Sequence, residues 1–258
     1  MLLQHDDNGR GPVVVLLHGF PFDRSMWASQ VEALSDQYRL IVPDLRGHGS
    51  SPAPDDRVYT IDAMADDLIE TLNALNLHEK VVLGGLSMGG YIALSAITRY
   101  PDRFMGLMLL DTKATSDPPE IARGRGITAE QVESSGNTET LVEGLILRVF
   151  AQETREHKPE LVESLRKVMK STSPRTIAAS LRGMAARPDR MDDLARIQLP
   201  TLILVGADDV VTPVSDAKAM AERLPNAKLA VITDSGHLAP LENPEASNTE
   251  ILSYLKEL

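Results

Sequence analysis

A serine flanked by small residues stands where a short apolar run changes into a helical pattern. The run covers residues 81–83, the helical spacing covers 91–99, and Gly-Gly-Leu-Ser-Met-Gly-Gly lies between them. In the Gly-x-Ser-x-Gly pattern of Gly85, Ser87 and Gly89, the serine occupies a sharp strand-to-helix turn that only small neighbours permit. The helix start adds unpaired N–H groups that stabilise negative charge. We predict that Ser87 is a nucleophile.

The Gly-x-Ser-x-Gly pattern alone is weak evidence for a nucleophile, because roughly one chain in ten of this size contains it by chance at average residue usage. Its place between an expected strand and an expected helix makes it specific. A nucleotide-binding interpretation fails, because the chain contains neither Gly-x-Gly-x-x-Gly nor a lysine of a phosphate loop.

A serine hydroxyl needs a general base and a third group that orients this base. Among the six histidines, His237 follows the apolar run 229–232 through a short polar loop. Catalytic groups gather at such carboxyl ends of parallel strands, so we predict His237 as the base. His18 and His48 each precede a glycine in a loop, which is typical of turn and scaffold residues.

Two adjacent carboxylates compete for the role of the acid. Asp208 and Asp209 follow the apolar run 201–205, between the serine and the histidine in the chain. This is the order Ser, Asp, His. Adjacent residues of an extended loop point to opposite sides, so only one of the two can face His237.

Stabilisation of an oxyanion requires two backbone N–H donors near the serine. We predict Met88, the residue after the nucleophile, and Phe20, in the loop that follows the run 13–17. Gly19 lets this loop approach the site closely, and Pro21 has no N–H to offer.

Short apolar runs alternate with longer amphipathic stretches. The runs are too short for helices and are apolar on both faces, as buried parallel strands are. They cover residues 13–17, 39–42, 81–83, 105–110, 201–205 and 228–232. Thr60, Thr212 and Asn243 are expected to begin helices between them. The alternation predicts an α/β fold with a mostly parallel, doubly wound sheet.

The alternation stops between residues 112 and 195. Helical patterns near 138–151, 159–171 and 174–187 replace it, and Pro159 and Pro174 stand in first-turn positions. The segment holds 13 basic and 13 acidic residues, whereas the whole chain carries a net charge of −11. We predict that residues 112–195 form a helical cap, or lid, inserted in a core of residues 1–111 and 196–258. A helical decoration without a role is the alternative.

The composition excludes several classes of protein. Among 258 residues, 26 are Lys or Arg and 37 are Asp or Glu, so a nucleic-acid partner is not expected. No uninterrupted apolar segment approaches 18 residues, which argues against a membrane partner, and the start lacks a signal-peptide pattern. The absence of cysteine excludes disulfides, thiolate nucleophiles and Cys-ligated zinc. We expect a cytoplasmic protein, monomer or dimer, that acts on a small molecule without a metal or cofactor.

Together the motifs resemble those of the α/β-hydrolase superfamily, in that superfamily's order and over essentially the whole chain. They are His18-Gly19-Phe20-Pro21, the segment 43–50, Gly85-Leu86-Ser87-Met88-Gly89-Gly90, Gly206 with Asp209 and Pro213, and Gly236-His237. The resemblance implies an α/β-hydrolase fold with the cap after the sixth strand. In this pattern the acid precedes a proline by four positions, which selects Asp209. Only about twelve residues precede the first buried strand, where the superfamily usually has two strands, and we expect one near residues 1–5.

Within the superfamily the chain resembles compact bacterial carboxylesterases and the group of 3-oxoadipate enol-lactonases and cofactor-free haloperoxidases, or perhydrolases. The resemblance implies a serine carboxylesterase that hydrolyses short-chain esters through an acyl-enzyme. Ile146, Phe150, Met169 and Met184 are candidates for the substrate pocket or for the core of the insert. A lactonase would need a cationic pocket residue, for which Arg123, Arg125, Arg148 and Arg182 are available. A slow, hydrolase-fold ligand receptor is a third interpretation.

Overall fold

The computed structural model describes residues 1–258 and contains one seven-stranded sheet with the order β1-β3-β2-β4-β5-β6-β7. Its first strand is antiparallel to β3, and all other neighbours are parallel. The strands are β1 (His5–Asn8), β2 (Val13–Leu17), β3 (Arg39–Pro43), β4 (Val81–Leu86), β5 (Phe104–Leu110), β6 (Thr201–Gly206) and β7 (Ala227–Ile232). Each apolar run forms a strand, so the predicted mostly parallel sheet is confirmed.

Two expectations about strand positions are wrong. The N-terminal strand lies at His5–Asn8 rather than near residues 1–5, because Leu3 is buried and its N–H donates to Thr71 Oγ1 at 3.0 Å. Residues 1–3 are therefore held by the helix that contains Thr71 instead of by the sheet. The helical insertion follows the fifth strand of this chain rather than the sixth, because a single strand precedes β2.

Alternate residues of the central strands fill two hydrophobic clusters on opposite faces of the sheet. In β2, Val13, Val15 and Leu17 belong to the first cluster, and Val14 and Leu16 belong to the second. The first cluster also contains residues of α2 (Ile61–Ala74), α3 (Met88–Arg99) and α9 (Val214–Ala221). The second contains residues of α1 (Ala28–Leu34) and α11 (Pro244–Leu255). Helices thus cover both faces, which explains why the strands are apolar throughout.

The chain reverses its direction across the sheet between β2 and β4. From β2 it passes through α1 to β3 on one side, and from β4 it passes through α3 to β5 on the other. Both strands are hydrogen-bonded neighbours, with Leu17 opposite Gly85. In open α/β sheets, ligands bind in the crevice outside the carboxyl ends of strands at such a reversal. Phe20 and Ser87 follow these two strands.

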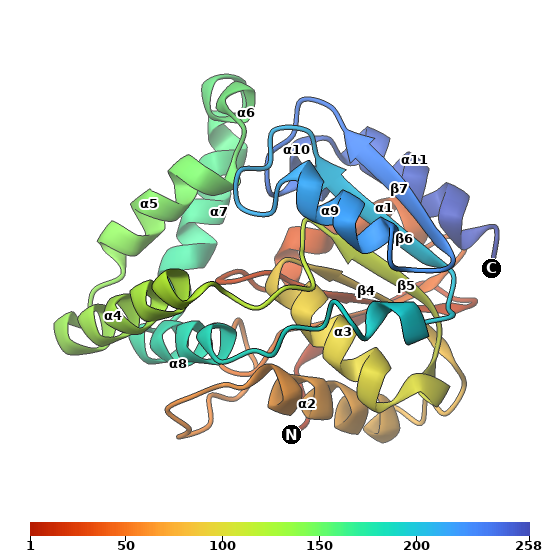
Figure 1. Ribbon diagram of the computed structural model, residues 1–258, viewed down its shortest axis with the longest axis horizontal. Coiled ribbons are helices and arrows are strands. Elements are labelled where there is room, and N and C mark those ends of the chain that lie inside the picture. Colours follow the sequence, from red (N-terminus) through yellow and green to blue (C-terminus); the bar gives the residue numbers. More distant parts are fainter.

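Five helices and no strand separate β5 from β6. They are α4 (Pro119–Ser135), α5 (Glu139–Val149), α6 (Gln152–His157), α7 (Pro159–Ser171) and α8 (Pro174–Ala185). Figure 1 shows them gathered at one end of the sheet, on the left, where α4 lies along α8 and α5 along α7. The sequence patterns did not predict α4, because Gly124 and Gly126 lower its helix propensity and only Ala129 and Val132 are buried. None of the helices combines the length and the apolar composition that a membrane span requires.

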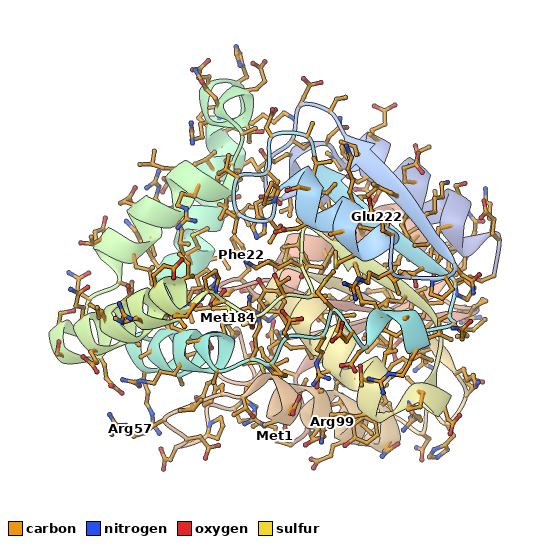
Figure 2. The ribbon with its side chains drawn as sticks, viewed as in Figure 1. Met1, Phe22, Arg57, Arg99, Met184 and Glu222 are labelled. Carbon is orange, nitrogen blue, oxygen red and sulfur yellow. The ribbon has the colours of Figure 1, made fainter.

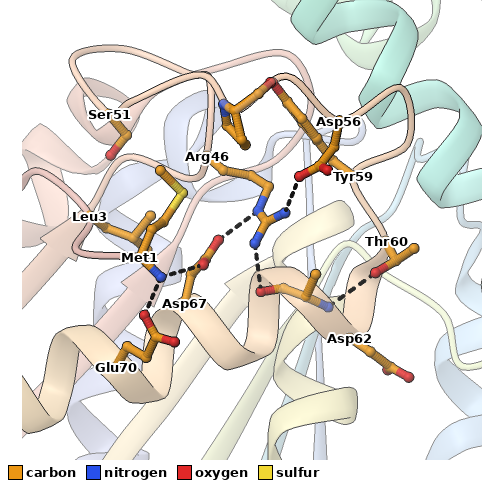
Figure 3. Close-up of polar contacts among 12 residues, drawn as sticks. Met1, Leu3, Arg46, Ser51, Asp56, Tyr59, Thr60, Asp62, Asp67 and Glu70 are labelled. Atoms are coloured by element: carbon orange, nitrogen blue, oxygen red, sulfur yellow. Dashed lines mark hydrogen bonds and ion pairs between the residues drawn. The ribbon is translucent and has the colours of Figure 1, made fainter.

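Arg46 holds the connection between β3 and α2 against α2. Its Nε donates to Asp67 Oδ2 at 2.6 Å and a terminal nitrogen donates to the Ala63 carbonyl oxygen at 3.1 Å (Figure 3). The Arg46 side chain is 10% exposed and that of Asp67 is 4% exposed. Removal of one partner of such a nearly buried pair strongly destabilises the folded protein. The pair therefore keeps this connection in place. Thr60 begins α2, as predicted, and accepts the N–H of Ala63.

Candidate active site

Ser87 occupies the sharp turn between β4 and α3. Its φ of 54° and ψ of −112° lie in a region that non-glycine residues rarely adopt. The turn brings Gly85 so close to Gly89 that a Cβ on Gly85 would overlap the Gly89 backbone. The Ser87 N–H donates to the Leu110 carbonyl at 3.0 Å, and the Ser87 carbonyl accepts from Thr112 Oγ1 at 2.8 Å. The strained turn is thus fixed from both sides, and the hydroxyl stands at the carboxyl end of the sheet.

We expect Gly85→Ala to lower the free energy of unfolding by about 2 kcal/mol or more, because a β carbon has no space between the turn residues. Urea denaturation would measure this change. Gly144→Ala on α5 is the matched control, since a β carbon there meets no neighbour, and we expect it to be neutral or stabilising by up to about 1 kcal/mol. Equal stabilities of the two variants would contradict the tight turn.

The predicted serine, histidine and aspartate converge from three loops at this end of the sheet. His237 Nε2 lies 2.8 Å from Ser87 Oγ, and His237 Nδ1 lies 2.8 Å from Asp209 Oδ2. His237 and Asp209 are each 4% exposed, and Ser87 is half-buried. When Nδ1–H donates to the carboxylate, Nε2 presents a lone pair to the serine hydroxyl. This is the geometry of a nucleophile, its base and the group that orients the base.

The surroundings of Asp209 stabilise its charged form. Oδ1 accepts the N–H groups of Val211 at 2.7 Å and Thr212 at 2.9 Å, and Oδ2 accepts the Thr212 hydroxyl at 2.8 Å. Burial opposes ionisation, but the interaction with His237 and these donors outweigh it and hold the pKa of Asp209 below its usual value. Asp208 is exposed and lines a groove with Leu147 and Val210 instead. The structure thus brings Asp209, and not Asp208, to the histidine.

Thr212 does not begin a helix, and this expectation is wrong. The helix α9 begins after Pro213 without a side-chain cap, and the Thr212 hydroxyl instead bonds Asp209 and lies 3.2 Å from His237 Nδ1. Asp209 is buried, so its carboxylate requires hydrogen-bond donors, and the Thr212 hydroxyl that donates to it is not available to cap α9. Asn243 does cap α11, as predicted, and accepts the N–H of Ala246.

The loop after β2 lies directly on the turn of Ser87. A Cβ on Gly19 would lie 2.9 Å from the Leu86 side chain and 3.5 Å from Ser87 Cβ. Met88 is the first residue of α3, so its N–H has no acceptor within the helix. The Phe20 N–H donates to no other backbone group. Two free donors therefore stand on the two sides of the crevice beside the serine, and their role in stabilising an oxyanion stays a prediction.

His18 and His48 support the loop that carries Phe20. His18 Nε2 accepts the Leu45 N–H at 2.9 Å, while Nδ1 donates to the Gly19 carbonyl at 2.8 Å. The His48 ring packs edge-on against His18, with 5.2 Å between ring centroids. Burial lowers the pKa of His18 to about 4 and that of His48 to about 3, so both are neutral at neutral pH. Neither competes with His237 as a base.

The four candidate pocket residues are all buried, but in two different clusters. Ile146, Phe150 and Met169 pack in the second cluster with Phe22, and Met184 packs in the first. Figure 2 shows Phe22 and Met184 where the helical insertion meets the sheet. A groove of about 690 Å³ between α4 and α5 has none of the four in its lining. Their contact with a substrate therefore stays a prediction.

Two buried carboxylates near the site were missed by the sequence analysis. Asp111 accepts the N–H of Gly206 at 2.8 Å and that of Ala239 at 3.1 Å. Burial and the nearby charge of Asp209 raise the pKa of Asp111 well above its usual value. Its position directly after the run 105–110 was a usable signal, since side chains at that place reach the site. Glu242 is the second carboxylate, and no local pattern marked it.

No group of three His, Cys, Asp or Glu residues is placed to hold a metal ion.

The sheet, its reversal between β2 and β4 and the serine turn define an α/β-hydrolase architecture. Residues 14–249 match the Alpha/beta hydrolase family, and the chain belongs to this family. 3-Oxoadipate enol-lactonase 1 of Acinetobacter baylyi is 32% identical to it over 237 residues, which cover 91% of this chain and 85% of that protein.

Solved structures are similar over nearly the entire chain. A thermophilic esterase from Thermogutta terrifontis, with malate bound, superposes with a TM-score of 0.96 and 44% identity over 99% of this chain and 93% of its own. The enol-lactonase from Burkholderia xenovorans superposes with a TM-score of 0.91 and 26% identity over 98% of this chain and 96% of its own. The relatives thus include esterases and enol-lactonases.

Proposed function

We propose that the protein is a serine carboxylesterase that hydrolyses short-chain carboxylic esters through an acyl-enzyme. The observation that carries this proposal is the continuous hydrogen-bonded chain from Asp209 through His237 to Ser87, with 2.8 Å at each step. The similarity to the Thermogutta terrifontis esterase supports the choice of an ester bond.

The geometry suits the following sequence of steps. His237 Nε2 removes the proton of Ser87 as its oxygen attacks the ester carbonyl, and the N–H groups of Phe20 and Met88 stabilise the oxyanion. The imidazolium then gives this proton to the leaving alcohol. Water activated by His237 attacks the acyl-serine and releases the acid. Asp209 stays ionised and orients the imidazole throughout.

The helices α4–α8 would form a cap over this site, within an insertion of residues 112–195. The carbonyl of Val149, the last residue of α5, accepts the His237 N–H at 2.9 Å, so the insertion contacts the reactive loop directly. The acyl chain would then lie among Ile146, Phe150, Met169 and Met184, between the cap and the sheet.

A lactonase is the second candidate, because two curated relatives are 3-oxoadipate enol-lactonases. A carboxylate-bearing lactone would be recognised by a cation. Arg125 is paired with Asp117 at 2.6 Å and Arg182 with Glu133 at 2.5 Å. Arg148 has no carboxylate partner and lines the 690 Å³ groove, whose lining holds no acidic residue. Of the four candidate arginines, Arg123 and Arg148 have no carboxylate partner, so they remain available to bind such a carboxylate.

A hydrolysis screen tests the proposal. Purified protein is assayed with p-nitrophenyl esters of increasing acyl length and, beside them, with neutral lactones and a carboxylate-bearing enol-lactone. Steady multiple turnover of the simple esters without a partner supports an esterase and contradicts a slow receptor. A strong preference for the enol-lactone over all neutral esters would favour the lactonase, and Arg148→Met should then raise KM for that substrate alone.

We expect kcat/KM to be highest for acetyl to hexanoyl esters and to fall beyond about eight carbons, since each methylene contributes up to about 0.8 kcal/mol only while it is buried. The apolar stripes of α7 and α8 pack into the two hydrophobic clusters, which leaves Ile121, Ile127 and Leu147 as the large apolar side chains exposed on the cap. This is a small surface for binding lipid. The rate should not rise when the substrate forms micelles. A maximum at dodecanoyl or longer, or a rate jump at the critical micelle concentration, would contradict this prediction.

A further inference from the structure

Glu242 is a carboxylate buried beside His237 that the proposed reaction does not use. It is the last residue of α10 (Ala239–Glu242) and is 0% exposed. Lys158 Nζ donates to the backbone carbonyl of Glu242 at 2.5 Å rather than to its carboxylate. A buried carboxylate is costly unless hydrogen-bond donors surround it. The groups that surround this one therefore indicate what it does.

Three backbone N–H groups meet the Glu242 carboxylate. Oε1 accepts from Gly236 at 2.9 Å and from Leu238 at 3.1 Å, the residues on either side of His237. Oε2 accepts from Ala151 at 2.8 Å, the residue that precedes α6. One oxygen thus holds the loop of the histidine, and the other holds the helical insertion.

The two segments that Glu242 joins are also in direct contact. The His237 N–H donates to the Val149 carbonyl, and a Cβ on Gly236 would lie 2.6 Å from the Ala151 nitrogen and 3.0 Å from the Phe150 carbonyl carbon. No side chain fits between them. The position of the histidine backbone is therefore set by residues 149–151 and by Glu242 together, while Asp209 orients the ring.

We infer that Glu242 is a positioning residue that fixes the cap segment 149–151 in register with His237, so that the base is aligned only while this segment is in place. The inference rests on the proposed function. It adds a link between the cap and the base, because the carboxylate touches backbone groups of both and neither the substrate nor the serine.

Three variants separate the two ends of the link. Glu242→Gln keeps an oxygen that can accept from Gly236 and Leu238, but turns its NH₂ group toward the Ala151 N–H. Ala151→Pro replaces that N–H with a ring carbon, so Oε2 loses its donor and must move away, and the Ala151 φ of −57° is one that proline adopts. Glu242→Ala removes both ends. Glu245→Gln, at an exposed position three residues away, makes the same change of charge and serves as the control.

Turnover of p-nitrophenyl butyrate is measured per active site, with the sites counted by phosphonate titration. A displacement of the base by about 1 Å lowers the rate about 100-fold. We therefore expect kcat to fall about 100-fold in Glu242→Ala and about 10-fold in Glu242→Gln and Ala151→Pro. In all three variants KM should stay within about 3-fold of the wild-type value. Glu245→Gln should match the wild type. The downfield proton resonance of the His237 Nδ1–H should broaden or move upfield in the first three variants only.

Folded variants with wild-type kcat per site and an unchanged Nδ1–H resonance would overturn the inference, even if their melting temperatures fall. A loss in Glu245→Gln equal to that in Glu242→Gln would also overturn it, because a general effect of charge would then suffice. If Glu242→Ala does not fold, Glu242→Gln and Ala151→Pro still test the inference. A wild type that hydrolyses no ester would contradict the proposed function, while the resonance would still report on the link.

Discussion

Replacing Ser87 with alanine is expected to reduce kcat for short-chain p-nitrophenyl esters by at least about three orders of magnitude. The variant loses the only oxygen that His237 Nε2 contacts at 2.8 Å, so no acyl-enzyme can form. The fold should survive, because the backbone N–H and carbonyl of residue 87 keep their hydrogen bonds to Leu110 and Thr112. Steady-state kinetics, with circular dichroism as a check on folding, measures this effect.

A phosphonate ester provides the direct control for this prediction. Intact-mass and peptide analysis of the wild type should show one adduct, located on Ser87, and the Ser87→Ala variant should remain unlabelled. His237→Ala should lose turnover to a similar extent, since the serine would lack its base. An adduct on another residue, or a Ser87→Ala variant with substantial activity, would contradict the assignment of the nucleophile.

The adjacent aspartates are expected to differ sharply. Asp209→Asn should lower kcat by about four orders of magnitude, because an amide facing His237 Nδ1 favours the tautomer whose Nε2–H cannot accept the serine proton. Asp208→Asn should stay within about 3-fold of the wild type, since an exposed carboxylate on another groove does not contact the imidazole. Parallel kinetics of the two variants makes the comparison.

The ionisation of Asp209 determines how pH affects the wild type. Because the pKa of Asp209 lies below its usual value, the wild-type carboxylate is ionised throughout the neutral range. A change of pH within that range should therefore leave the charge of Asp209 in the wild type unchanged. The contribution of this carboxylate to stability is present above the pKa of an unfolded aspartate, about 3.9, and is lost as the pH falls through its lower folded value. The reverse ranking of the two variants would show that Asp208 is the acid.

Local features of the chain were predicted well because their causes lie within a few residues. A strand buried on both faces must be apolar at every position, so each buried parallel strand appears in the sequence as a short continuous run. The serine turn requires small residues at Gly85 and Gly89 because its own backbone leaves no space for more. The caps at Thr60 and Asn243 likewise depend only on the first turn of each helix.

The remaining features depend on partners that are distant in the sequence. Thr212 has the residue type and the following proline of a helix cap, yet it serves Asp209 because that carboxylate is buried beside His237. The N-terminal strand is displaced because Leu3 is held by Thr71, 68 residues away. The helix α4 has little apolar periodicity of its own and is formed by packing on α8.

The sequence by itself therefore determined the parallel sheet, the turn of Ser87 and the two aspartates from which the acid had to be chosen. The family resemblance selected Asp209, and the tertiary structure places it, rather than Asp208, against the imidazole. Only the tertiary structure brought Glu242 to both sides of His237. The physical reason is the range of the interactions involved. Backbone conformation and burial within a strand act over a few residues, whereas a hydrogen bond between side chains from separate loops exists only when the sheet brings those loops together.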